Sequence, residues 1–499
     1  MSELSLSQNS RLGPCESEGP FGDQSSVLAC ASTERRGRRG FQKVLAAFAF
    51  MLMAFASPAL AQPQTQQATP AAQHGVPVRE ITSPGGIKAW FVSGSTVPMI
   101  VLSAYWRGGG AMEPQGLEGV TSVMADMLTE GAGTLDSNAF SERLQDLNMA
   151  LDFSANDDGV SMSLTTLTAN RDAAFEMARL ALTAPRFDAE PLARIKGQLQ
   201  VSIRARETNP SYIAGVAMED ALYPGHPYAR RVSRQSVDAI TVPAMQARRA
   251  ALLSRNRIMI TLVGDLDEAT AGRLLDSTFG ALPNLSAPQE PPDVVLHPAT
   301  PLIVRQLPQP QSVISFAGPG IPVTDPDWIP LAVANYILGG GGFSSRLMDK
   351  VREQRGLVYG ISTSPSVADH LALIRGGAQS ENGRVKEALD VTRAEMARLY
   401  TDGATQAEVS DAITYLTGSF ALDLDSDIKI TSVLSSYQDS GRDITYVNRR
   451  NDLIRAVTLA DVNRVIRRLL DPAQFTFVVV GQPVGLDANA PPTTAPATH

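Results

Sequence analysis

The stretch Phe343-Ser-Ser-Arg-Leu347 repeats, at an offset of 203 residues, the stretch Phe140-Ser-Glu-Arg-Leu144. In each half of the chain a β-branched run also ends in glycine, at Gly264 and at Gly481. A strand followed by a helix precedes the repeated stretch in both halves, so the matches recur in one order. Recurrence at a fixed offset is the signature of internal repeats, and about 200 residues is a typical domain size. The sequence therefore predicts two homologous domains.

Short β-branched runs alternate with amphipathic stretches, which is typical of mixed helix and strand domains. We expect an α+β protein made of two α/β domains of about 200 residues each. Asp136 or Ser137 is placed to cap a helix, and Asn156-Asp-Asp-Gly159 has the composition of a turn between two strands. The expected strands are 97–104, 257–263, 312–316 and 475–480, and the expected helices are 119–129, 137–147, 189–207 and 328–338.

Composition shifts along the chain suggest its organisation. Four prolines lie between 283 and 293, which is typical of an interdomain linker. The expected segments are a signal peptide with a doubtful N-terminal extension at 1–61, a linker at 62–78, a first domain at 79–282, a Pro-rich linker at 283–296, a second domain at 297–485 and a disordered tail at 486–499.

An export signal is indicated near the N-terminus. Basic residues at 35–43 precede the apolar run 44–56, and Ser57-Pro-Ala-Leu-Ala61 supplies a small-x-small cleavage pattern. Thirteen apolar residues are short for a membrane span. We expect cleavage after Ala61, a periplasmic or secreted protein, and no membrane span after cleavage. An uncleaved amphipathic anchor is the alternative, and the sequence leaves open the export route and whether the true start lies downstream.

Charge and cysteine content exclude several classes of protein. Acidic residues outnumber basic ones by 51 to 43, and no basic stripe with interleaved aromatics follows residue 43, so nucleic acid is not an expected partner. Both cysteines, Cys15 and Cys30, precede the expected cleavage site. The mature chain would then have neither disulfides nor a thiol nucleophile.

Histidine limits the metal chemistry that the chain can support. The five histidines are His74, His226, His297, His370 and His499, and no two lie within five residues of each other. No helix can therefore present two imidazoles on one face to zinc.

A resemblance to a known family is carried by several stretches in one order. Arg107-Gly-Gly-Gly-Ala-Met-Glu-Pro-Gln-Gly-Leu-Glu-Gly119, a helix and then Glu130-Gly131 resemble the start of the inverted-motif zinc peptidases, the pitrilysin and mitochondrial processing peptidase family. Further landmarks are Arg206-Glu-Thr-Asn-Pro210, His226-Pro-Tyr228, Leu262-Val-Gly-Asp265, Gly340-Gly-Gly-Phe-Ser-Ser-Arg-Leu347 and Arg352-Glu-Gln-Arg-Gly-Leu-Val-Tyr359. The resemblance covers about residues 80–483. It implies two processing peptidase-like domains and a clam-shell dimer that encloses a peptide chamber.

The zinc motif of that family is degenerate in this chain. Active members carry His-x-x-Glu-His on the first-domain helix and a glutamate ligand about 76 residues further on. That frame falls on Ser122, Ala125 and Asp126, and the distal ligand falls near Ser202. We therefore expect no metal ligand and no catalytic residue at these positions. The expected role of Ser122, Asp126 and Ser202 is ordinary helix surface.

The substrate-contacting pattern of the second domain is intact. The family implies substrate contacts for an arginine and a tyrosine seven residues apart, which are Arg352 and Tyr359 here. A guanidinium offers paired donors to peptide carbonyls, and a phenol can donate to an oxyanion. Arg355 is a weaker candidate, and an exposed ion pair for Arg352 and simple packing for Tyr359 are the alternatives. Gly339 to Gly342 predict a close backbone approach, a mobile loop or the end of a helix.

These residues predict a catalytically silent, peptide-binding subunit of a periplasmic heterodimer. Its partner would be a zinc-bearing paralogue with His-x-x-Glu-His, and zinc, the cofactor, would belong to that partner. The alternative is a stand-alone peptide-binding or scaffold protein, a homodimer of the cell envelope. A peptidase with unusual metal ligands ranks last.

Overall fold

The computed structural model describes residues 75–94 and 97–486, so the expected signal peptide, most of the first linker and nearly all of the tail lie outside the described residues. The first sheet has the strand order β1-β2-β6-β3-β5-β4. β2 and β6 pair in parallel, and the other neighbours pair antiparallel. The strands are β1 Arg79–Thr82, β2 Lys88–Ser93, β3 Met99–Arg107, β4 Ala150–Ala155, β5 Gly159–Leu167 and β6 Ile258–Gly264.

Local sequence explains how the helices of the first half begin. The Asp136 carboxylate accepts a hydrogen bond from the N–H of Ala139 at 2.9 Å, as expected for the cap of α2. Asn156 accepts from the N–H groups of Asp158 and Gly159, which makes the expected turn between β4 and β5. The helices are α1 Val120–Met127, α2 Ser137–Asp146, α3 Arg171–Thr183, α4 Ala189–Arg206, α5 Pro210–Leu222, α6 Arg234–Ala239, α7 Val242–Leu252 and α8 Glu268–Phe279.

The second sheet repeats the topology of the first. Its order is β7-β11-β8-β10-β9, which equals β2-β6-β3-β5-β4 when each strand is replaced by its counterpart. The pair β7 and β11 is parallel, as β2 and β6 are, and the other pairs are antiparallel. The strands are β7 Ile303–Gln306, β8 Gln311–Pro319, β9 Ile361–Ala368, β10 Leu371–Glu381 and β11 Thr476–Gly481. The expected α+β class with two similar halves is confirmed.

The helices of the second half include two π-helical segments. The helix expected at 328–338 is α-helical to Asn335 and continues as the π-helical segment Tyr336–Gly340. A second π-helical segment, Met348–Glu353, precedes β9. The α-helices are α9 Trp328–Asn335, α10 Val385–Asp402, α11 Gln406–Ser419, α12 Asp427–Asp439, α13 Tyr446–Arg455 and α14 Leu459–Leu469.

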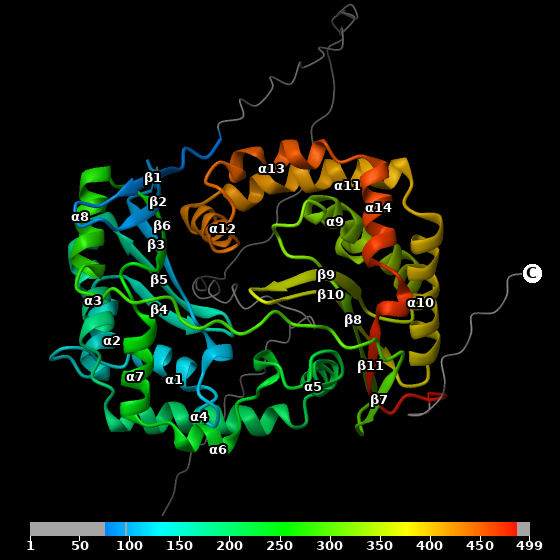
Figure 1. The fold of residues 1–499 in the computed structure, drawn as a ribbon, viewed down its shortest axis with the longest axis horizontal. Coiled ribbons are helices and arrows are strands. Elements are labelled where there is room, and N and C mark those ends of the chain that lie inside the picture. Colours follow the sequence, from blue (N-terminus) through cyan, green and yellow to red (C-terminus); the bar gives the residue numbers. More distant parts are fainter. Residues whose placement is uncertain (1–74, 95–96, 487–499) are drawn as a thin grey trace, which may run out of the picture. The chain divides into compact units, whose positions relative to one another are not determined.

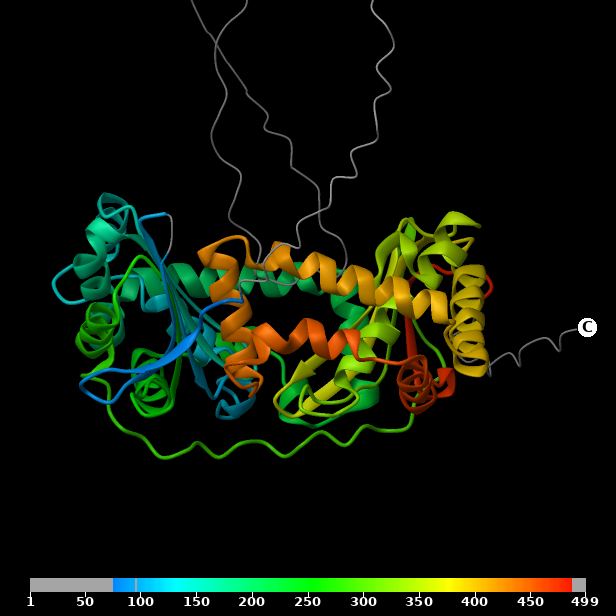
Figure 2. The ribbon, with the colours of Figure 1, turned by 90° about the horizontal axis from the view of Figure 1, so that it is seen from above.

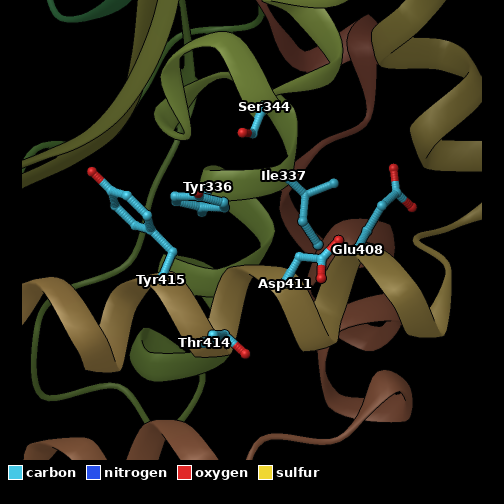
Figure 3. Close-up of a pocket in the computed structure, with 7 residues that line it drawn as sticks. All are labelled: Tyr336, Ile337, Ser344, Glu408, Asp411, Thr414 and Tyr415. Atoms are coloured by element: carbon cyan, nitrogen blue, oxygen red, sulfur yellow. The ribbon is translucent and has the colours of Figure 1, made fainter. Parts of the chain in front are cut away.

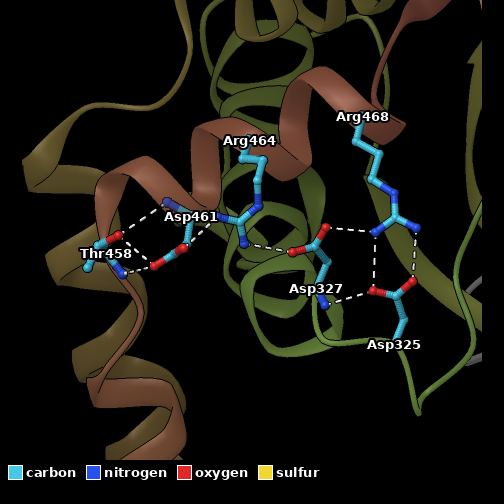
Figure 4. A network of polar contacts seen from close by, with 6 residues as sticks. All are labelled: Asp325, Asp327, Thr458, Asp461, Arg464 and Arg468. Carbon is cyan, nitrogen blue, oxygen red and sulfur yellow. Dashed lines mark hydrogen bonds and ion pairs between the residues drawn. The ribbon is translucent and has the colours of Figure 1, made fainter.

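α14 packs one face in the core and forms ion pairs with another face. Its buried residues recur with helical spacing, at Val462, Val465, Ile466 and Leu469. On another face, Arg464 and Arg468 each donate to Asp327 at 2.7 Å, and Arg468 also pairs with Asp325 at 2.9 Å (Figure 4). These ion pairs attach α14 to the start of α9.

The two halves exchange one helix each (Figure 1). α12 of the second half packs on β3 and β6, and α5 of the first half packs on β8 and β11. Because side chains alternate along a strand, neighbouring residues of one strand serve different cores. Phe91 belongs to the main core of the first half, whereas Trp90 packs in a cluster with Leu434 of α12. Each sheet therefore has one face covered by its own half and one covered by the other half.

The Pro-rich segment between the halves has no regular structure. α8 ends at Phe279 and β7 begins at Ile303, and Figure 2 shows the intervening chain as an extended ribbon. Its 283–296 boundaries as a linker stay a prediction. Within residues 75–94 and 97–486 no helix is both long and apolar enough to cross a membrane.

Candidate functional site

The positions of the zinc-motif frame lie on α1. Ser122 and Asp126, four residues apart, are exposed on one face of this helix, whereas Ala125 is fully buried. Ser122 and Asp126 thus lie on the helix surface, as expected. Ala125 belongs to the core of the first half.

Ser202 lies half-buried on α4, which packs against α1. Between these helices, Arg194 of α4 forms an ion pair with Glu130 at 2.5 Å. Although the Asp126 side chain reaches solvent, the surrounding protein desolvates its carboxyl and raises its pKa to about 6, and the neighbouring charge of Glu130 adds to this effect. The surroundings of Asp126 therefore favour the protonated carboxyl more than water does.

This donor set does not fit a catalytic zinc ion. One carboxylate and two hydroxyls lack the neutral nitrogen ligands that zinc sites use, and the alanine cannot act as a base. Among the residues that the structure describes, no group of three or more His, Cys, Asp or Glu side chains could hold a metal ion. We therefore assign no reaction step to these four positions.

Arg352 lies on the second π-helical segment, where Phe343 orders it. The guanidinium carbon is 4.6 Å from the centre of the Phe343 ring, and the ring is 66% exposed. Arg352 also forms an ion pair with Glu353 at 3.3 Å, and its side chain is 33% exposed. The stack holds the plane of the guanidinium, and the ion pair with Glu353 uses one end of its edge.

Tyr359 follows this segment, two residues before β9, and is 75% exposed. Within the described part of the chain no hydrogen bond or ion pair joins Tyr359 to Arg352, or either of them to the α1 positions. The weaker candidate, Arg355, donates to the carbonyl of Lys350 at 2.8 Å. The structure thus presents an exposed phenol and an ordered guanidinium near each other in sequence.

Gly339, the first residue of the glycine cluster, is tightly packed. Gly339 is buried against β9, where a Cβ atom would lie 2.6 Å from the Thr363 hydroxyl and 2.8 Å from its backbone nitrogen. Three roles were expected for Gly339 to Gly342, and the structure shows the close backbone approach at Gly339. Gly342 has a φ of +55°, a left-handed conformation that favours glycine.

Sequence reasoning missed Phe343 as a site residue. The repeat pairs it with Phe140, which is fully buried, whereas Phe343 is exposed. The signal available in the sequence was an aromatic residue directly after four glycines.

Comparison with known proteins finds relatives of this chain. The model of the peptidase M16 inactive domain matches residues 239–416. A non-peptidase homologue of Helicobacter pylori, YmxG, is 22% identical over 387 residues, which is 77% of this chain and 89% of that protein. An uncharacterized zinc protease of Streptomyces coelicolor is 23% identical over 422 residues, covering 80% of this chain and 88% of that protein.

Solved structures agree with this fold. The crystal structure of a peptidase M16 inactive domain from Pseudomonas fluorescens superposes with a TM-score of 0.77 at 27% identity, over 82% of this chain and 99% of that one. The periplasmic protease PqqL of Escherichia coli has the same fold, with a TM-score of 0.70 at 16% identity over 88% of this chain and 49% of that one. Residues 239–416 thus match the M16 inactive domain, and the chain resembles M16 proteins in sequence and fold, which is consistent with a non-catalytic, pitrilysin-like protein.

Proposed function

We propose that this chain is the substrate-binding, non-catalytic subunit of a periplasmic, two-subunit zinc peptidase. Its partner is a paralogue that carries His-x-x-Glu-His and supplies the zinc. The expected export signal supports the periplasmic location. The partnership is supported by the similarity to M16 proteins together with the loss of the residues that zinc requires.

One observation carries the assignment of a peptide-contacting role. Arg352 is held by the Phe343 ring and Tyr359 is exposed, while the described residues of the first half offer no metal-binding set. An ordered guanidinium loses little side-chain entropy when it binds a peptide carbonyl or carboxylate. Arg352 and Tyr359 would donate hydrogen bonds to a peptide that the partner cleaves.

The test is co-expression with the nearest secreted paralogue that has His-x-x-Glu-His. Peptide cleavage is then measured for each chain alone and for the mixture, with Arg352→Ala and Tyr359→Phe in this chain. We expect activity in the mixture and a loss of about 100 to 1,000-fold on removal of a donor, as for oxyanion donors in other enzymes. Melting temperature and complex formation should stay unchanged.

Arg355→Ala is the matched control, because Arg355 lies two residues beyond this segment and its side chain donates only to the carbonyl of Lys350 among the described residues. It should leave cleavage intact. Full activity in both the Arg352 and Tyr359 variants would show that these residues have only a structural role and would contradict the proposal.

A second candidate is a stand-alone peptide-binding or scaffold protein, as a homodimer of the cell envelope. The similarity to a protein named a non-peptidase homologue favours it. A pull-down from the periplasm separates the two candidates. Recovery of a zinc-bearing M16 paralogue supports the heterodimer, and recovery of the bait alone supports the scaffold.

A further inference from the structure

A cavity of about 370 Å³ lies between the π-helical segment that follows α9 and the helix α11 (Figure 3). This volume is near the lower end of ligand pockets, which span about 300 to 1,000 Å³. Its lining side chains offer hydroxyls, carboxylates and aromatic faces but no positive charge. They are Tyr336, Ile337, Ser344, Glu408, Asp411, Thr414 and Tyr415.

Two tyrosines form one wall of this cavity. The ring centres of Tyr336 and Tyr415 are 5.0 Å apart, with an angle of 36° between the ring planes. Tyr336 is 8% exposed and Tyr415 is 57% exposed, so the buried ring supports the open one. The faces of aromatic rings carry negative potential, which attracts cations.

Only one of the two carboxylates in the cavity is neutralised by a neighbour. Arg346 binds Glu408 through two hydrogen bonds, of 2.6 Å and 2.9 Å. Burial alone would raise the pKa of Glu408, but the bonds from Arg346 and Thr405 outweigh it and lower the pKa to about 2. Asp411 is exposed, and its carboxylate has no hydrogen bond or ion pair with any residue that the structure describes. The cavity therefore carries an uncompensated negative charge beside a tyrosine ring.

We propose that this cavity binds the cationic side chain of a peptide, the ammonium of lysine or the guanidinium of arginine. Asp411 supplies the counter-charge and Tyr415 an aromatic surface. The hydroxyls of Ser344 and Thr414 accept the remaining N–H groups. An anion is repelled from such a lining, and the described residues offer no cluster fit for a metal ion.

The cavity also adjoins the segment that presents Arg352. Ser344 lines the cavity, and its neighbour in sequence, Phe343, stacks on Arg352. A peptide bound at Arg352 can thus extend towards the cavity. The proposal itself concerns this chain alone and needs neither a partner nor its zinc, so it stands or falls separately from the proposed function.

The test uses the purified chain and three capped pentapeptides, acetyl-Gly-Gly-X-Gly-Gly-amide, in which X is lysine, arginine or norleucine. Norleucine keeps the length of the lysine stem without the charge. Binding is measured by calorimetry at pH 7 and low salt for the wild type and for Asp411→Asn and Tyr415→Leu. Both variants change exposed side chains, and their melting curves check the fold.

We expect the lysine and arginine peptides to bind at least about tenfold more tightly than the norleucine peptide, because a hydrogen bond to a charged group contributes about 1.5 to 3 kcal/mol. Asp411→Asn should remove most of this difference, and Tyr415→Leu should reduce it. The matched control is Glu387→Gln, which removes an exposed carboxylate from α10 and should change nothing. Equal binding of all three peptides, no effect of Asp411→Asn, or no binding of the lysine peptide at millimolar concentration would overturn the proposal.

Discussion

Arg107, at the end of β3, forms an ion pair with Asp369 in the turn between β9 and β10. Arg107 also donates to the carbonyl of Asp439, at the end of α12, at 2.5 Å. One guanidinium thereby joins a strand of the first half to two elements of the second half. Next to it, Asp158 accepts hydrogen bonds from the Tyr228 hydroxyl and from the N–H of Asp369.

Replacing this guanidinium should destabilise the protein. Arg107→Ala leaves partly buried acceptors without a donor, which typically costs about 1 to 3 kcal/mol; the 36% exposure of the Arg107 side chain favours the lower end. Urea unfolding measures this loss. Arg79→Ala is the control, because both partners of the Arg79–Glu268 pair are more than half exposed and such pairs contribute about 0 to 1 kcal/mol. Equal losses in both variants would contradict a special role for Arg107.

The same contact predicts a pH dependence. Burial raises the pKa of Asp439 to about 6, and the charges of Asp369 and Asp158 add to the rise against the opposing effect of Arg107. The pKa of an aspartate in an unfolded chain is about 3.9, which is lower than that of Asp439 in the folded chain, so the folded chain binds this proton more tightly. The resulting stability is present at acid pH and is lost as pH rises through about 6.

Asp439→Asn should therefore be more stable than the wild type at pH 7.5. The gain should stay below about 1 kcal/mol, because the Asp439 side chain is 41% exposed and water screens its charge. The difference should vanish near pH 4, where the wild-type carboxyl is protonated as well. Melting temperatures of both proteins from pH 4 to 8 check this, and a constant difference across the range would refute it.

Gly339 should tolerate no side chain. In Gly339→Ala the new methyl group would overlap Thr363 of β9, including its backbone nitrogen, and such overpacking costs about 1 to 3 kcal/mol. At Gly360 a Cβ atom meets nothing within 4 Å, so Gly360→Ala should change the free energy of unfolding by less than about 0.5 kcal/mol. Equal effects of the two substitutions would show that the glycines serve another purpose than packing.

Restoring the zinc motif should fail for two reasons. Ser122→His with Asp126→His supplies two ligands, one fewer than the usual three protein ligands, unless Ser202 also becomes glutamate. Ala125→Glu places a carboxylate where no solvent reaches, which should cost at least about 2 kcal/mol. Metal analysis after dialysis should find far less than one zinc per molecule in the wild type and in the triple variant. One tightly held zinc in the wild type would show that the motif alignment is wrong.

Local sequence patterns predicted much of this structure. Runs of β-branched and other apolar residues located β3 and β6 to within two residues at each end except for the C-terminal end of β3, and Asp136 marked the start of α2. Contacts between distant segments were not readable in the same way. Phe343 and Phe140 occupy matching stretches yet differ in burial, since burial depends on the neighbours that the fold brings. The cavity beside Asp411 joins segments about seventy residues apart, and an amphipathic helix such as α12 does not indicate which sheet it will cover.

The crossing of α5 and α12 determines where this chain can be divided. A cut in the extended segment between α8 and β7 would give two fragments. Each fragment would keep a helix that packs on the sheet of the other, and one face of its own sheet would lose its cover. Val263 and Trp90 in one fragment, and Val478 and Val480 in the other, would then face water. Such bare apolar faces recruit other chains and favour aggregation. Although the sequence indicates a duplication, each half needs the helix of the other half to cover its sheet, so we expect the two halves to fold as one unit.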